Sequence, residues 1–146
     1  MGGAPTLFAL IASGITLAFN LYLDLKKGEI SPWACAVLFV VASFEPGKDY
    51  AMSFLSATIG FLPMFIVAVI GHGGAGDALL IGSLCYTLPL VFSVYMCLFA
   101  SLSYVFALIP MIIKSKDSKK RLPYVPFICI GWLIILTFYL AGGFRA

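Results

Sequence analysis

Residues 71–77 read Gly71-His72-Gly73-Gly74-Ala75-Gly76-Asp77, which places four glycines and a carboxylate between two long apolar runs. The run before the glycines extends from Tyr50 to Ile70, and apolar sequence continues after Asp77 almost unbroken to Ile113. An acid at such a position marks a functional site by default, because an ionised group at membrane depth is costly. Asp24 directly follows the first apolar run of the chain, and we expect the two aspartates to meet.

The composition is typical of an integral membrane protein. Of the 146 residues, 62% are hydrophobic and only 10% are charged, and the mean hydropathy is +1.09. A soluble domain of this length could not bury so much apolar surface. The net charge of +3 is too small to indicate nucleic-acid binding. We therefore expect a single membrane-embedded domain over residues 1–146, with the lipid bilayer and no nucleic acid as a partner.

Glycines, prolines and charged residues divide the chain into apolar segments of helical length. Ser31 followed by Pro32 is typical of a helix start, because the hydroxyl caps free amides and proline has a suitable φ. Asp49 can cap the next helix, and the segment Leu88-Pro89-Leu90 separates two further ones. The pattern predicts an all-α polytopic protein with about six transmembrane helices, at residues 7–23, 32–44, 50–70, 77–90, 92–113 and 124–141.

The basic residues indicate how these helices are oriented. If the segments alternate across the membrane, seven of the nine Lys and Arg residues lie on one side, at Lys26, Lys27 and in the loop 114–121. Only Lys48 and Arg145 lie on the other side. The positive-inside rule then makes the basic side cytoplasmic and places both termini outside. Asp24 and the glycine stretch are expected at the cytoplasmic face of the cell membrane.

Two carboxylates in one site of low dielectric constant cannot both ionise easily, so they share a proton. That state suits peptide hydrolysis, because the ionised carboxylate activates water while the protonated one polarises the scissile carbonyl. Gly74 and Gly76 would shape the site by adopting positive φ or by allowing close approach. Simpler interpretations also exist. Asp77 can be a helix-capping acid in an ordinary loop, and Asp24 can be a surface acid paired with Lys26 or Lys27.

Other chemistries have weaker support. Residues 71–76 match the dinucleotide pattern GxGxxG, but a long apolar segment precedes them and no acid follows about 20 residues later. The four cysteines are scattered without a CxxC pair, and His72 is the single histidine. We therefore expect neither a metal nor another cofactor. His72 either tunes the aspartates or is an interfacial polar residue of the loop.

Three segments together resemble a known family. Gly74-Ala75-Gly76-Asp77 resembles the GxGD motif of polytopic membrane aspartyl proteases. The segment from Asp24 to Ser31 is similar to the first motif of type IV prepilin peptidases, in which a basic residue, an isoleucine and a helix start follow the aspartate. Leu122 to Phe127 is similar to the Pro-x-x-Pro-Phe segment that opens the last helix of these enzymes. The order and spacing of the three segments match those of the family.

The resemblance implies an aspartic endopeptidase that removes class III signal peptides from prepilin-like precursors at the cytoplasmic face. Asp24 and Asp77 would be its catalytic pair, and a type IV pilin or archaellin precursor its partner. The chain has no room for a cysteine-rich cytoplasmic insert, so it resembles the minimal archaeal or Flp/Tad-type peptidase core without methyltransferase activity. Two positions depart from the pattern: Ala78 and its neighbours stand where a lysine is frequent, and Ser31 stands where proline is common.

Two other functions remain open at this stage. One is a GxGD protease of another type, which would cut within a membrane span. The other is a small cation or proton carrier that uses the buried aspartates as a relay.

Overall fold

Local sequence signals account for the helices of the computed structural model, which describes residues 6–70, 74–115 and 123–142. Thr6 caps the first helix by accepting a hydrogen bond from the Ala9 amide at 3.2 Å. Ser31 and Asp49 cap the second and third helices in the same way, as predicted. The helices are α1 (Leu7–Lys27), α2 (Pro32–Ser43), α3 (Tyr50–Val69), α4 (Ala75–Thr87), α5 (Leu90–Ser115) and α6 (Val125–Leu140).

The first helix continues beyond the apolar run that predicted it. It passes through Asp24 to Lys27 and ends at Gly28, which adopts a left-handed conformation with φ 67°. Lys26 and Lys27 lie in the last turn, where cations interact favourably with the helix dipole. Asp24 is therefore a helical residue, and Asn20 lies one turn before it on the same face.

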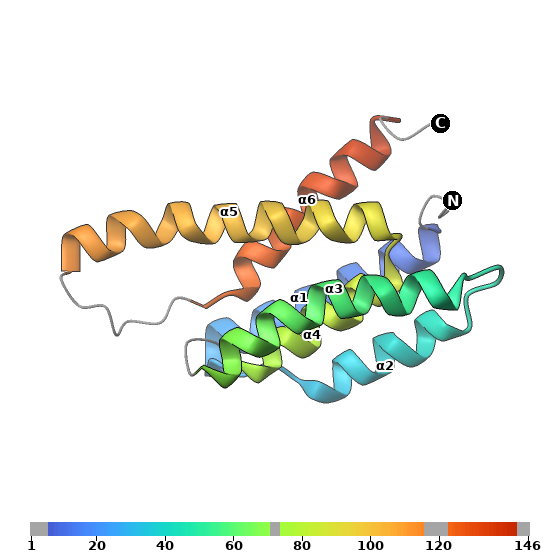
Figure 1. Cartoon of the computed structure of the whole chain (residues 1–146), viewed down its shortest axis with the longest axis horizontal. Coiled ribbons are helices and arrows are strands. Elements are labelled where there is room, and N and C mark those ends of the chain that lie inside the picture. The colour runs from blue at the N-terminus through green and yellow to red at the C-terminus, as the bar shows by residue number, and fades with distance from the viewer. Residues whose placement is uncertain (1–5, 71–73, 116–122, 143–146) are drawn as a thin grey trace.

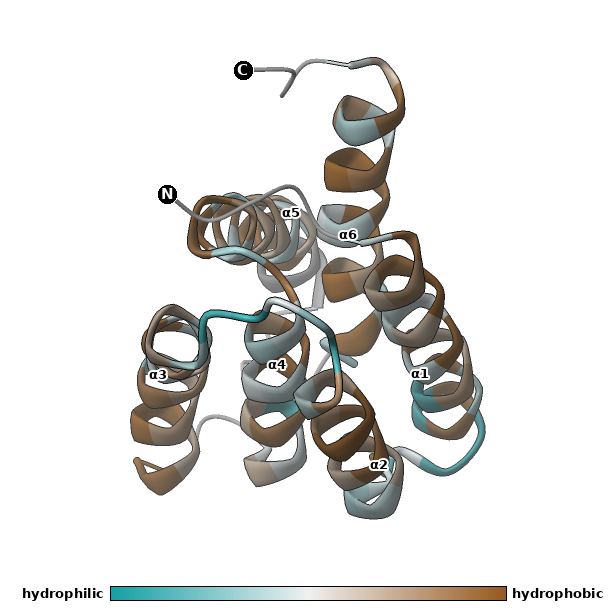
Figure 2. Ribbon diagram, turned by 90° about the vertical axis from the view of Figure 1, so that its right-hand side faces the viewer, coloured by the Kyte–Doolittle hydropathy of each residue, from teal (hydrophilic) through white to brown (hydrophobic). Residues whose placement is uncertain are grey.

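The described residues form an all-helical bundle in which α4 is central. Every residue from Leu80 to Thr87 is buried, because α4 packs against α2, α3, α5 and α1. Figure 2 shows α4 between α3 and α2, with α6 packed on α5 and directed away from the lower bundle. The buried core joins α1, α2, α4, α5 and α6 through apolar side chains such as Leu17, Leu38, Leu84, Met96 and Ile128.

Three of the six described helices are long and apolar enough to cross a membrane: Leu7–Lys27, Tyr50–Val69 and Leu90–Pro110. They expose large apolar side chains to the exterior, including Phe8, Phe54 and Phe106, as expected for helices in contact with lipid. The all-α fold and its membrane character are thus confirmed. The count of six spans is not. The 12 residues of α2 rise only about 18 Å, against about 30 Å of hydrocarbon.

The chain runs back and forth along the bundle, so helix ends from distant parts of the sequence meet. In Figure 1, α1 and α3 end on the same side of the molecule, where α2, α4 and α6 begin. The start of α1 and the turn between α2 and α3 lie at the opposite end. This arrangement places Asp24, in the last turn of α1, and Asp77, in the first turn of α4, at one end of the bundle.

Candidate active site

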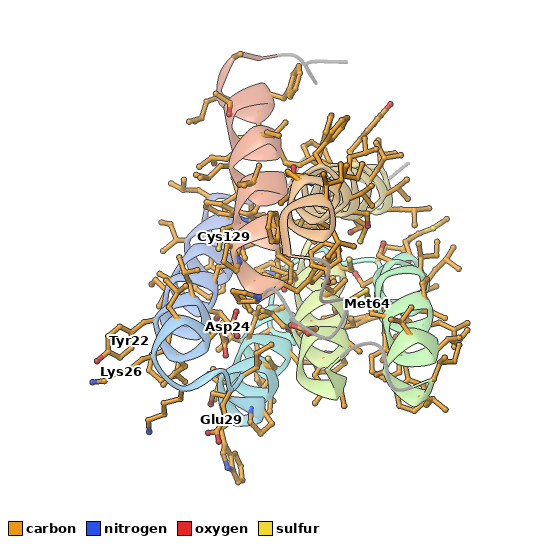
Figure 3. All side chains as sticks on the ribbon, turned by 90° about the vertical axis from the view of Figure 1, so that its left-hand side faces the viewer. Tyr22, Asp24, Lys26, Glu29, Met64 and Cys129 are labelled. Carbon is orange, nitrogen blue, oxygen red and sulfur yellow. The ribbon has the colours of Figure 1, made fainter. Side chains whose placement is uncertain are left out.

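Asp24 lies on the inner side of α1. Figure 3 shows its side chain directed toward the bundle, whereas Tyr22 and Lys26 extend outward from the same helix. The carboxylate accepts a hydrogen bond from the backbone amide of Val125, the first residue of α6. Its second oxygen, Oδ2, is buried and has no hydrogen-bond partner among the described residues. A buried acceptor without a partner is costly, so this oxygen is free to receive a proton or a water molecule.

Pairing with a neighbouring lysine does not account for Asp24. Lys26 Nζ donates a hydrogen bond to the Tyr22 hydroxyl at 2.9 Å and lies over the Tyr22 ring. Within the described ranges, the one salt bridge joins Lys48 to Glu45, at the far end of the bundle. The carboxylate of Asp24 is thus turned away from the basic residues that follow it.

Asp77 is the third residue of α4 and closes the start of that helix. The N-cap residue is Gly74, which has no side chain to supply a cap. The Asp77 amide donates to the Gly74 carbonyl at 3.1 Å, and the Asp77 carboxylate accepts a hydrogen bond from the Gly74 amide. This reciprocal pair is the acidic half of a capping box. The helix-capping interpretation of Asp77 is therefore confirmed as a local contact.

The Asp77 carboxyl also interacts with Asp24. Asp77 lies outside the three helices that are long enough to span a membrane. Burial and, to a smaller extent, the nearby charge of Asp24 raise the pKa of Asp77 to about 6, although the hydrogen bond from the Gly74 amide acts in the opposite direction. The two aspartates, 53 positions apart in the sequence, thus lie within electrostatic range, as expected.

Gly74 and Gly76 keep this region compact. A Cβ on Gly74 would lie 2.9 Å from Oδ2 of Asp77, and a Cβ on Gly76 would lie 3.0 Å from the Cβ of Ile30. Both glycines are closely approached, but the neighbours are Asp77 itself and Ile30, whereas a substrate backbone or the other aspartate was expected. Positive φ is not found at either position, because Gly74 is extended with φ −94° and Gly76 lies within α4. The glycines provide space for neighbouring side chains, and an unusual backbone conformation is not required.

The start of α6 completes the cluster. Tyr124, its N-cap residue, is 9% exposed, and its hydroxyl lies 3.4 Å from the Ser101 hydroxyl of α5. Burial raises the pKa of Tyr124, and the charge of Asp77 adds to the rise, so the two groups are neighbours. All three segments of the family resemblance therefore meet. Asp24 contacts Val125, Gly76 contacts Ile30, and Asp77 lies near Tyr124.

The sequence did not predict the contacts made by Val125 and Tyr124. Proline and aromatic residues marked the start of a helix there, but the amide that binds Asp24 carries no sequence signal because every residue except proline has one. His72 lies outside the described residues, so the structure does not bear on its interpretation. Among the described residues, no three His, Cys, Asp or Glu side chains gather into a group that could hold a metal ion.

An apolar cavity of about 500 Å³ lies between α2, α3 and α4, and neither aspartate lines it. Its lining includes Leu79, two residues after Asp77, and Pro32, the first residue of α2. Small residues on all three helices form part of the wall: Cys35, Ala36, Ala57, Gly82 and Ser83. The cavity therefore reaches the end of the bundle at which α2 and α4 begin.

The arrangement brings two carboxyl groups within electrostatic range of each other, so that ionisation of Asp24 disfavours ionisation of Asp77. No family model, curated protein or solved structure matches the chain.

Proposed function

We propose that this protein is a membrane aspartyl endopeptidase that cleaves the class III signal peptide of pilin- or archaellin-type precursors. The observation that carries the proposal is the placement of Asp24 and Asp77 at one end of the bundle, within electrostatic range of each other, with an unpartnered buried oxygen on Asp24. The resemblance of the segments that contain them to prepilin peptidase motifs supplies the substrate class. No cofactor takes part in the proposed reaction.

The environments of the two carboxyls suggest different roles. Asp77, with its raised pKa, is the group that holds the proton and donates a hydrogen bond to the scissile carbonyl. Asp24, whose carboxylate accepts a hydrogen bond from the Val125 amide at the start of α6, acts as the base and takes a proton from the attacking water. Water adds to the carbonyl carbon to give a tetrahedral diol. The C–N bond then breaks as the amine takes the proton that Asp24 received from water, and a hydroxyl of the diol returns to Asp77 the proton that it gave to the carbonyl oxygen.

The membrane setting of the proposal follows the charge distribution. The long helices α1, α3 and α5 cross the membrane in one direction, and the shorter helices α2, α4 and α6 return the chain to the opposite side. The end that carries the aspartates faces the cytoplasm, and both termini lie outside. A precursor with a basic leader and an apolar helix would then place its junction at the aspartates, with apolar residues beside the cavity near Leu79.

The test is co-expression with a pilin-like precursor, with processing followed by the change in precursor mass. We expect Asp24→Asn and Asp77→Asn each to reduce processing by at least about 10²-fold, the usual contribution of a general acid or base. Asp49→Asn is the matched control, because Asp49 caps α3 at the opposite end and asparagine caps equally well. Processing retained in either aspartate variant would exclude the two-carboxylate mechanism.

The same co-expression experiment distinguishes the proposed peptidase from the two alternative functions. A cut before the apolar helix of the precursor supports the prepilin-type reaction, whereas a cut within that helix indicates a GxGD protease of another type. The buried, unpartnered oxygen of Asp24 is also compatible with a proton or cation carrier. That function predicts ion flux into liposomes and no cleavage product.

A further inference from the structure

Asn20 is a completely buried polar residue on α1, one turn before Asp24. Its Nδ2 donates a hydrogen bond to the Thr16 carbonyl at 3.0 Å, within the same helix. Its Oδ1 accepts a hydrogen bond from the backbone amide of Ser31 at 2.8 Å. This second bond joins positions 11 residues apart and links α1 to the start of α2. Because the amide has a partner at both ends, its burial is compensated.

The α1–α2 connection, which Asn20 holds, follows Asp24 in the chain and packs against the residue that precedes Asp77. After Asp24 the chain leaves α1 at Gly28, passes through Ile30 and enters α2 at Ser31. Ile30 packs against Gly76, so closely that a Cβ on this glycine would lie 3.0 Å from the Ile30 Cβ. Gly76 immediately precedes Asp77. The bond from Ser31 to Asn20 thus fixes the segment that presses on the start of α4.

We propose that Asn20 is a positioning residue that sets the separation of Asp24 and Asp77 by holding the α1–α2 connection through the Ser31 amide. This role rests on the proposed peptidase function and deepens it. Asn20 touches neither the substrate nor the reacting atoms, and it acts on Asp77 through Ile30 and Gly76.

The identity of residue 31 fits this role. Proline has no amide hydrogen to donate, so the bond to Asn20 exists only because another residue occupies this position. Ser31 also caps α2 through its hydroxyl, which accepts from the Ala34 amide at 3.3 Å. The two functions of Ser31 can be separated by substitution.

The test uses four variants of the full chain in detergent: Asn20→Leu, Ser31→Pro, Ser31→Ala and the double variant Asn20→Leu/Ser31→Pro. Leucine matches the size of asparagine without its hydrogen bonds. Ser31→Pro removes the amide donor at a φ of −80° that proline tolerates, and Ser31→Ala removes only the capping hydroxyl. The last variant is the matched control. The measured quantities are kcat and KM for cleavage of a pilin-like peptide.

We expect Asn20→Leu and Ser31→Pro each to lower kcat by about 10-fold or more with KM changed less than about twofold, because small displacements of reacting groups slow the chemical step. Ser31→Ala keeps kcat within about threefold of wild type. The double variant is no slower than the slower single variant, since both remove the same bond. Wild-type kcat in Asn20→Leu, or losses that multiply in the double variant, would overturn the proposal.

A second measurement separates this proposal from the peptidase function. Hydrogen exchange at the Ser31 amide, followed by NMR of protein labelled at serine nitrogen, is slow in wild type and fast in Asn20→Leu if the bond forms. An inactive wild-type protein overturns the peptidase function and the positioning role with it. An active wild type whose Ser31 amide exchanges equally in both proteins overturns the positioning role alone.

Discussion

Asp77 illustrates how one residue can satisfy two interpretations that the sequence presents as alternatives. Its carboxylate completes the first turn of α4 through Gly74 and also interacts electrostatically with Asp24. The capping contact fixes the direction of the side chain, and burial with a second acid favours its neutral form. A local helix signal thus orients a carboxyl for which the proposed chemistry requires a defined position.

The raised pKa of Asp77 predicts a pH dependence of stability. An aspartate in the unfolded chain has a pKa of about 3.9, whereas that of Asp77 in the folded protein is about 6. The folded state therefore binds more protons than the unfolded state between these values, and stability falls as pH rises through about 4 to 6. We expect the melting temperature in detergent to decrease over this interval, and Asp77→Asn to remove that part of the decrease.

The groups that face Asp77 are Asp24 and Tyr124, and Tyr124 stays neutral over this range because burial raises its pKa. The control is Asp49→Asn, which removes an exposed carboxyl at the other end of the bundle. Between pH 4 and 6, the melting temperature of this variant should decrease with pH as steeply as that of wild type. If the melting temperature of Asp77→Asn decreased with pH as steeply as that of wild type, the assignment of the raised pKa to Asp77 would be contradicted.

At the scale of elements, the sequence predicted all six helices because each boundary has a local cause. Ser31 and Asp49 supply caps, and Pro89 separates α4 from α5. The apolar pattern predicts that α1 ends at Leu23, four residues before its observed end at Lys27, because the residues that follow Leu23 are mostly charged. They continue it, and the chain turns only at Gly28, where a left-handed conformation favours glycine.

The packing between elements could not be predicted in the same way. The contact of Ile30 with Gly76 joins two turns far apart in sequence, and neither residue alone indicates its partner. The same holds for the Val125 amide that binds Asp24. The motif segments suggested a common site, but only the fold determines which atoms meet there.

Gly76→Ala tests the contact between the α1–α2 connection and α4. The added Cβ meets the Cβ of Ile30 at 3.0 Å, and this atom is attached directly to the backbone, so the connection must shift by a few tenths of an ångström. We expect peptide cleavage to fall about 10-fold or more while the protein stays folded, because the shift separates the aspartates. Cleavage rate and melting temperature should be measured on the same samples.

Gly14→Ala is the matched control for this element-scale prediction. Its Cβ would meet a ring carbon of Trp132 at 3.1 Å, a similar distance, but the neighbour is the far end of a side chain. Gly14 lies ten residues before Asp24, about 15 Å along α1. Cleavage should remain within about threefold of wild type. Equal losses in both variants would show that any crowding between helices impairs the protein, whatever its distance from the aspartates.

For the whole molecule, hydropathy predicted the fold class correctly but overestimated the number of helices that are long enough to cross a membrane. A short helix that is apolar on all sides resembles a membrane span in sequence, and it can equally be the core of a bundle. This is the case for α4, in which Leu80 to Thr87 are buried by the surrounding helices. Length separates the two cases, because three helices exceed the span requirement and α2, α4 and α6 do not.

Membrane sidedness is the prediction that belongs to the whole molecule. Seven of the nine Lys and Arg residues lie at Lys26, Lys27 and in the loop 114–121, so this side should face the cytoplasm. A fluorescent protein inserted in the loop should then fold and fluoresce, and alkaline phosphatase fused after Ala146 should be active outside the membrane. Opposite locations for the two reporters require α6 to cross, although its 16 residues rise only about 24 Å.

Substitution of Lys119, Lys120 and Arg121 by glutamine provides the control for this prediction. It leaves four basic residues on the cytoplasmic side against two on the other, so a fraction of the molecules should insert in the inverted orientation if charge sets the sidedness. Glutamine at Lys48 removes a charge from the other side and should leave the wild-type orientation unchanged. Reporters on the same side would mean that α6 returns within the membrane, and the end that carries Asp24 and Asp77 would then need another assignment. Reporters in reversed positions would place the aspartates outside, where the basic leader of a prepilin-like precursor does not reach them.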